Sequence, residues 1–184
     1  MELSQKGSFV SISDFERLKV ELVWTSAVDL DLMVFYKTRD GGVGGVFSEN
    51  YKGGTLGSLS TAPYIQLSGD AGVGAADGAK HEVVHVANLE HFEQLAVCAL
   101  NYTDGAADSQ AVFANYDAHV EVTTDDGEAF IVKLDSNEPG SVAMICKLLP
   151  TFLGSDLVNK SEVMSVDKLR SVAPGAGELE LVKI

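Results

Sequence analysis

Basic residues are scarce in this chain of 184 residues. It has 13 lysines and arginines against 27 aspartates and glutamates, a formal net charge of −14. Nucleic acids and anionic membrane surfaces attract basic patches, so the charge balance excludes both as expected partners. The sequence also lacks the run of about 18 apolar residues that a membrane-spanning helix requires. No basic stretch precedes an apolar segment near Met1, so we expect neither membrane insertion nor a secretory signal.

Cysteine is almost absent. The two cysteines, Cys98 and Cys146, lie inside apolar segments and not at the tips of loops. A free cysteine in such a segment behaves as a small buried hydrophobe, and structural disulfides are rare in the cytosol. We therefore predict two reduced cysteines in a cytoplasmic protein, with a single pairing between them as the alternative.

The segments that are present are short, rich in β-branched residues and interrupted by glycine. This pattern predicts an all-β protein, a β-sandwich of about eight or more strands. Asp40–Gly45 is expected to be a flexible turn and Thr124–Gly127 a hairpin turn, because Asp-Gly tolerates positive φ. The segment 141–149 is apolar enough for either a core strand or a short helix. The expected strands are 8–12, 18–24, 30–36, 62–68, 82–87, 94–101, 111–122 and 129–134.

The character of the sequence changes after Pro150. Ser155 and Ser165 each precede an acidic position in the manner of a helix N-cap, and Pro174–Gly177 breaks the chain. The last residues, 178–184, alternate as in a strand. We predict a β-sandwich domain over residues 1–150 and a small mixed C-terminal extension over 151–184, packed on the sandwich.

Two aspartates stand at the expected beginning of a strand, where Asp29-Leu30-Asp31-Leu32 follows the apolar segment 20–24. On a strand the two carboxylates leave the same face, about 6.5 Å apart along the backbone. Carboxylates held side by side repel each other unless a positive charge lies between them. Asp29 and Asp31 therefore either face water or converge on a hard cation such as Ca²⁺.

Several segments, in order along residues 3–150, resemble the TerD-type tellurite-resistance and stress-protein family. The resemblance rests on Leu22–Trp24 with Asp29–Leu32, on the glycine-rich acidic run from Gly69 to Glu82, on Ala111–Val120, and on Gly127-Glu128 with Val142–Ile145. It implies a non-enzymatic, bacterial-type stress or tellurite-resistance module, a β-sandwich that binds calcium through acidic loops at one end.

Carried over to this sequence, the resemblance implies calcium ligands at Asp29, Asp31, Asp70, Asp77 and Glu82, with backbone carbonyls near 72–75 completing the shell. The second loop departs from the family pattern, which carries a denser acidic cluster. Ala79-Lys80-His81 stands where further carboxylates are expected. Calcium affinity follows the number of charged ligands, so we expect this side of the site to be weaker.

A zinc hydrolase is the competing interpretation, because His81-Glu82-Val83-Val84-His85 matches the HExxH pattern and His91 follows at the metzincin spacing. That chemistry needs both histidines on one face of a helix, with Glu82 as general base. The β-branched valines instead favour a strand. On a strand His81 and His85 would lie about 13 Å apart and Glu82 would point to the opposite side.

A third interpretation needs no metal. Residues 101–140 carry nine acidic residues against a single lysine, Lys133. Such a surface keeps a protein soluble and could also bind a basic protein partner. The sequence identifies no particular partner and no oligomeric state.

Overall fold

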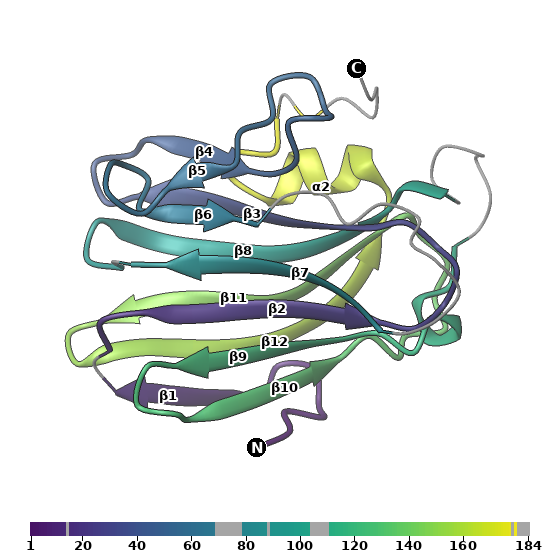
Figure 1. Cartoon of the computed structure of the whole chain (residues 1–184), viewed down its shortest axis with the longest axis horizontal. Coiled ribbons are helices and arrows are strands. Elements are labelled where there is room, and N and C mark those ends of the chain that lie inside the picture. Colours follow the sequence, from purple (N-terminus) through teal and green to yellow (C-terminus); the bar gives the residue numbers. More distant parts are fainter. Residues whose placement is uncertain (14, 69–78, 88, 104–110, 178, 180–184) are drawn as a thin grey trace.

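Twelve strands make up most of the structure, a computed structural model that describes residues 1–13, 15–68, 79–87, 89–103, 111–177 and 179 (Figure 1). They form two antiparallel six-stranded sheets, in the orders β1-β12-β11-β8-β3-β4 and β10-β9-β2-β7-β6-β5. The strands are β1 (Phe9–Ser13), β2 (Leu18–Trp24), β3 (Leu30–Thr38), β4 (Val43–Val46), β5 (Gly57–Ser58), β6 (Ile65–Leu67), β7 (Lys80–Val86), β8 (Phe92–Asn101), β9 (His119–Thr124), β10 (Ala129–Lys133), β11 (Val142–Thr151) and β12 (Gly154–Met164). The predicted all-β sandwich is confirmed.

The main core lies between the two sheets. Strand β2 shows how the sequence builds it, because Leu18, Val20, Leu22 and Trp24 alternate with partly exposed residues and are all fully buried. This period of two places one face of a strand on the core. Trp24 and Phe113 are among the largest side chains of this core, and both are 0% exposed.

A second apolar cluster covers the outer face of the first sheet. There the helix α2 (Val166–Val172) and the residues after it pack on the β3 and β8 side chains that point away from the main core. Strands β3 and β8 are therefore buried on both faces. Their sequences read as nearly continuous apolar runs for that reason. Ser165 caps α2, its side chain accepting a hydrogen bond from the Lys168 main-chain N–H, as predicted. No helix in the described part of the chain is long and apolar enough to cross a membrane.

Two predictions about the turns and strands were wrong. The turn expected over Asp40–Gly45 ends at Gly42, because strand β4 begins at Val43. The glycines of β4 make room for aromatic rings: a Cβ at Gly44 would lie 2.3 Å from Tyr36 Oη. The strand expected over 111–122 begins only at His119. Before it, Phe113–Asn115 forms a 3₁₀ turn.

The segment that follows residue 150 also differs from its prediction. Ser155 does not cap a helix, because residues 154–164 form β12, which pairs with β11 on one side and β1 on the other. The segment 141–149, left open between strand and helix, lies in strand β11 from Val142 onward. The strand expected over 178–184 lies outside the described residues except for Leu179. The division of the chain at residue 150 stays a prediction.

Cys98 and Cys146 are both buried, and the structure leaves both free. They lie on neighbouring strands β8 and β11, but Cys146 belongs to the main core and Cys98 to the outer cluster, so the two thiols point to opposite faces of the sheet. Side chains on opposite faces cannot approach to disulfide distance without rebuilding the strands.

We therefore expect both thiols to be unreactive in the native protein. Burial raises the pKa of Cys146 to about 12 and that of Cys98 still further, so neither is a thiolate at neutral pH. A thiol reagent should label no cysteine in buffer and two in denaturant without reductant. Labelling of fewer than two in denaturant would contradict this placement of the thiols.

Candidate metal-binding site at the start of strand β3

Asp29 and Asp31 lie where the chain enters strand β3, and both are buried, with 4% and 1% of their surfaces exposed. The main chain of Asp29 is held on both sides. Its N–H donates to Thr103 Oγ1 at 2.9 Å, and its carbonyl accepts from the Tyr102 N–H at 3.0 Å. Residues 102 and 103, which follow β8, therefore fix the main chain of Asp29, the first of the two aspartates.

Asp31 accepts a hydrogen bond from a tyrosine. Tyr51 Oη donates to Asp31 Oδ2 at 2.6 Å, and Tyr51 itself is 1% exposed. The tyrosine is held by its loop, since its N–H donates to the Ser48 carbonyl and its carbonyl accepts from the Gly54 N–H. Gly54 is required at this close approach, because a Cβ there would lie 2.0 Å from the Ser48 carbonyl oxygen. Sequence reasoning missed Tyr51, which lies 20 residues from its partner with no local signal.

Glu82 joins the two sheets. On β7 it points inward with Val84, and it is 1% exposed. Its Oε2 accepts a hydrogen bond from the main-chain N–H of Leu32 on β3, at 2.6 Å. Strand β4 pairs with β3 only as far as Val34, so it offers no main-chain acceptor to the N–H of Leu32. The Glu82 carboxylate from the opposite sheet is the acceptor instead.

The structure places three of the five predicted ligands near residues 29–32, but on two faces of β3: Asp31 lies on the outer face with Tyr51, while Glu82 meets the strand from the space between the sheets. Asp29 and Asp31 are two residues apart, and Glu82 reaches the main chain next to Asp31. Asp70 and Asp77 lie outside the described residues. Within the described part of the chain, no group of three or more His, Cys, Asp or Glu side chains is placed to hold a metal ion.

The HExxH residues do not have the geometry of a zinc protease. They lie on strand β7, as expected from the valines, with His81 and His85 exposed on one face and Glu82 buried on the other. His81 Nδ1 lies 2.8 Å from Glu21 Oε1. The hydrogen bond from Lys19, and then the one with His81, hold the pKa of Glu21 below its usual range. His91 stacks on the ring of Tyr64.

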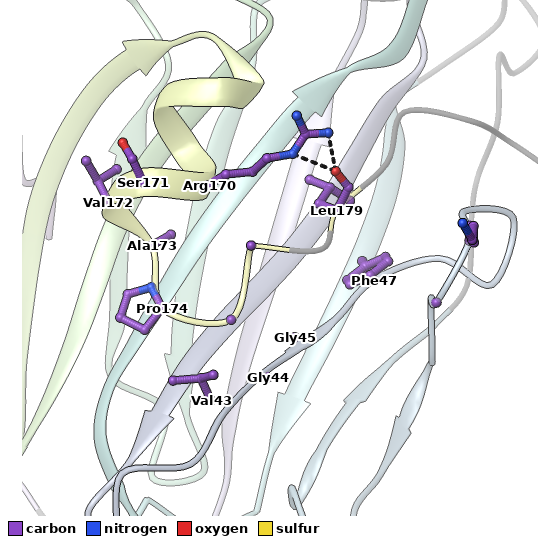
Figure 2. A pocket seen from close by; sticks show the side chains of 14 residues that line it. Val43, Gly44, Gly45, Phe47, Arg170, Ser171, Val172, Ala173, Pro174 and Leu179 are labelled. Carbon is purple, nitrogen blue, oxygen red and sulfur yellow. Dashed lines mark hydrogen bonds between the residues drawn. The ribbon is translucent and has the colours of Figure 1, made fainter.

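A pocket of about 1050 Å³ lies elsewhere, between strand β4 and the segment that follows α2 (Figure 2). Arg170 points across its rim, and its Nε and Nη2 both donate to the Leu179 carbonyl, while Nη1 lies 2.7 Å from Asp167 Oδ1. These contacts use the guanidinium to hold residue 179 in place. None of the predicted site residues that the structure describes, Asp29, Asp31 and Glu82, lines this pocket.

Solved structures with the same fold exist. A homologue of the telluride resistance protein TerD from Streptomyces coelicolor A3(2) superposes with a TM-score of 0.60 at 15% identity, over 83% of this chain and 92% of that one. A protein of unknown function, SAV2460, superposes with a TM-score of 0.57 at 11% identity, over 81% and 92%. No family model and no curated protein matches the sequence. At these identities the likeness concerns the fold, and the chain has the TerD-type fold that its motifs predicted.

Proposed function

We propose that this protein is a non-enzymatic calcium-binding module of the TerD type, acting in the cytoplasm in stress or tellurite resistance. The observation that carries the proposal is the pair of carboxylates at the start of β3: Asp29 just before the strand and Asp31 on it are both almost fully buried and are two residues apart. Burial of two like charges this close is unfavourable unless a cation or several hydrogen bonds compensate it.

The chemistry of these donors fits calcium. Carboxylate oxygens are the ligands that this hard cation prefers, and it takes six to eight oxygens in flexible geometry. Asp29 and Asp31 would supply the first of them. Asp70 and Asp77, with backbone carbonyls near residues 72–75, would supply others from outside the described residues. Glu82, whose Oε2 accepts the Leu32 N–H, supports strand β3 beside the ligands.

In this proposal the protein's own groups position the two aspartates before calcium binds. Tyr51 holds one oxygen of Asp31, and contacts from residues 102 and 103 hold the backbone of Asp29. When bound, calcium would neutralise the paired carboxylates and join the β3 end to the neighbouring acidic segment. The surface formed there would bind a protein partner that remains to be identified.

The test is a calcium titration of chelator-treated protein, followed by thermal melting. A ligand that binds only the folded state adds about 2.7 kcal/mol when it is present at 100 times its dissociation constant. For a chain of this length we expect the melting temperature to rise by about 5–10 °C. Magnesium should produce little of this rise, because it demands tighter octahedral geometry and loses its water reluctantly.

A melting curve that millimolar calcium leaves unchanged would refute the calcium proposal. The net charge of −14 would then favour a metal-free module whose acidic surface binds a basic protein.

A further inference from the structure

Two large apolar residues, Phe152 and Leu153, form the turn between β11 and β12, in a register that pairs Thr151 with Gly154. Phe152 is 99% exposed and Leu153 is 74% exposed, and no other large apolar side chain that the structure describes is as exposed as Phe152. Two-residue hairpin turns favour Asn, Asp and Gly, because these residues adopt the backbone conformations that such turns need. Neither the turn nor the core therefore accounts for a phenylalanine and a leucine at these positions.

A pocket of about 660 Å³ lies directly beside this turn. Its lining includes Thr151 and Phe152 from the turn itself, together with the apolar side chains of Phe15 and Leu89. Figure 1 places the turn between β11 and β12 at the left end of the sandwich, whereas β2 runs to the right toward its connection with β3. The exposed turn and the pocket thus share one surface, at the opposite end of the sandwich from the candidate metal-binding site.

The pocket also carries one charge of each sign, on the exposed residues Arg39 and Glu90. Arg39 Nε donates to the main-chain carbonyl of Glu90 at 2.8 Å, which holds the guanidinium at the pocket. Within the described part of the chain, Arg39 forms no ion pair with a carboxylate. Two copies of a chain with a net charge of −14 repel each other where acidic surfaces meet, so a surface with balanced charges is one at which they can approach.

We propose that this surface is the contact of a two-fold homodimer, in which Phe152 of each copy enters the pocket of the other. An isologous interface needs a projection and a matching cavity side by side on one surface, as Phe152 and the pocket are. The same two-fold axis brings Arg39 of one copy to Glu90 of the other, so the charges complement each other twice.

The contact is small, and the dimer is therefore weak. Burial of one aromatic side chain removes about 150–250 Å² of surface from water, and each copy contributes one. With Leu153 and the walls of both pockets, the total is on the order of 1,000 Å², near the lower limit for a specific interface. We expect half of the chains to be dimeric at a protein concentration on the order of 100 µM, measured by sedimentation velocity between about 10 µM and 1 mM.

The variant Phe152→Ser tests the projection. It removes two contacts at once, one from each copy, and should raise the dissociation constant of the dimer by at least about tenfold. Because Phe152 is almost fully exposed, the melting temperature of the dilute protein should stay within about 2 °C of the wild-type value. Phe9→Ser is the matched control, since Phe9 is 65% exposed but lies at the far end of β1 from the turn and does not line the pocket.

The variant Glu90→Arg tests the charge pairing. It makes the chain less negative by two charges, so a general loss of repulsion would tighten the dimer. The proposed contact instead places two arginines of one copy against two of the other, and we expect the dissociation constant to rise by at least about fivefold. Adding Arg39→Glu to the same chain exchanges the two charges and should restore the dissociation constant to within about threefold of the wild-type value.

Several results would overturn this inference. Wild-type protein that stays monomeric up to about 1 mM would do so, as would a dimer that Phe152→Ser leaves intact. A dimer that Phe9→Ser weakens as much as Phe152→Ser is joined along the β1 edge, and one that Glu90→Arg tightens does not place Arg39 against Glu90. Monomeric protein that binds vesicles of neutral phosphatidylcholine through Phe152 would assign the turn to a membrane surface instead. None of these results bears on the calcium proposal.

Discussion

Replacing Glu82 with alanine should lower the free energy of unfolding by about 3 kcal/mol, since it leaves the buried N–H of Leu32 without its acceptor and opens a cavity between the sheets. The bond from Leu32 N to Glu82 Oε2 is 2.6 Å long, and both residues are at most 1% exposed. In a chain of this length the loss corresponds to a fall of about 6–12 °C in melting temperature. Unfolding in denaturant, monitored by circular dichroism, measures the change in the free energy of unfolding.

The conservative variant separates the hydrogen bond from the charge. Glu82→Gln keeps an oxygen that can accept from Leu32, and it should be destabilised by less than half as much. Glu93→Ala is the matched surface control, because Glu93 is half exposed and only pairs with Lys37; we expect a loss of under about 1 kcal/mol. If Glu82→Ala unfolds at the wild-type denaturant concentration, Glu82 does not join the sheets in solution.

Asparagine at position 31 should remove most of the calcium-dependent rise in melting temperature. The substitution keeps an oxygen that can accept from Tyr51 Oη, but it takes one negative charge from the pair of carboxylates. In chelator the variant should melt within about 2 °C of the wild-type protein, because the repulsion between the two buried carboxylates is relieved as the charge is lost. Only the melting temperature in calcium should therefore fall.

Three related variants sharpen this comparison. Asp29→Asn should behave like Asp31→Asn. Asp70→Asn should lose less of the rise if the substitution of Ala79-Lys80-His81 for acidic residues has weakened that side of the site. Asp167→Asn, on α2 and 89% exposed, removes one solvated carboxylate that is not among the predicted ligands and should keep the full rise. A full rise in Asp31→Asn would exclude the start of β3 as the metal site.

Local alternation predicted much of the sandwich. Strands β2 and β10 were placed within a residue of their observed ends, because apolar and polar positions alternate cleanly in both. The same alternation predicted that Glu82 and His81 leave opposite faces of β7. The acceptor role of Glu82 could not be predicted, since the Leu32 N–H is 50 residues away and lies in the other sheet.

The errors can each be traced to particular residues. In the segment before β9 the buried aromatic residues Phe113 and Tyr116 are three apart, which fits a 3₁₀ turn better than a strand. Strand β12 lacks an apolar alternation because two of its buried positions are polar, Ser155 and Asn159. Asn159 is satisfied there by donating from Nδ2 to the Leu3 carbonyl at 2.7 Å, a contact that spans 156 residues.

The order of the first sheet also sets a sequence of events during synthesis. Strand β1, among the first residues made, pairs with β12 and with no other described strand, in a register that joins Phe9 to Val158 and Ser13 to Gly154. Strand β1 therefore cannot pair in a sheet until about 140 further residues have been synthesised and β12 is available. Such long-range pairing slows folding. Strands β2 and β3 by contrast need only the chain as far as β9 to find their partners, so the end that carries the aspartates can assemble before the chain is complete.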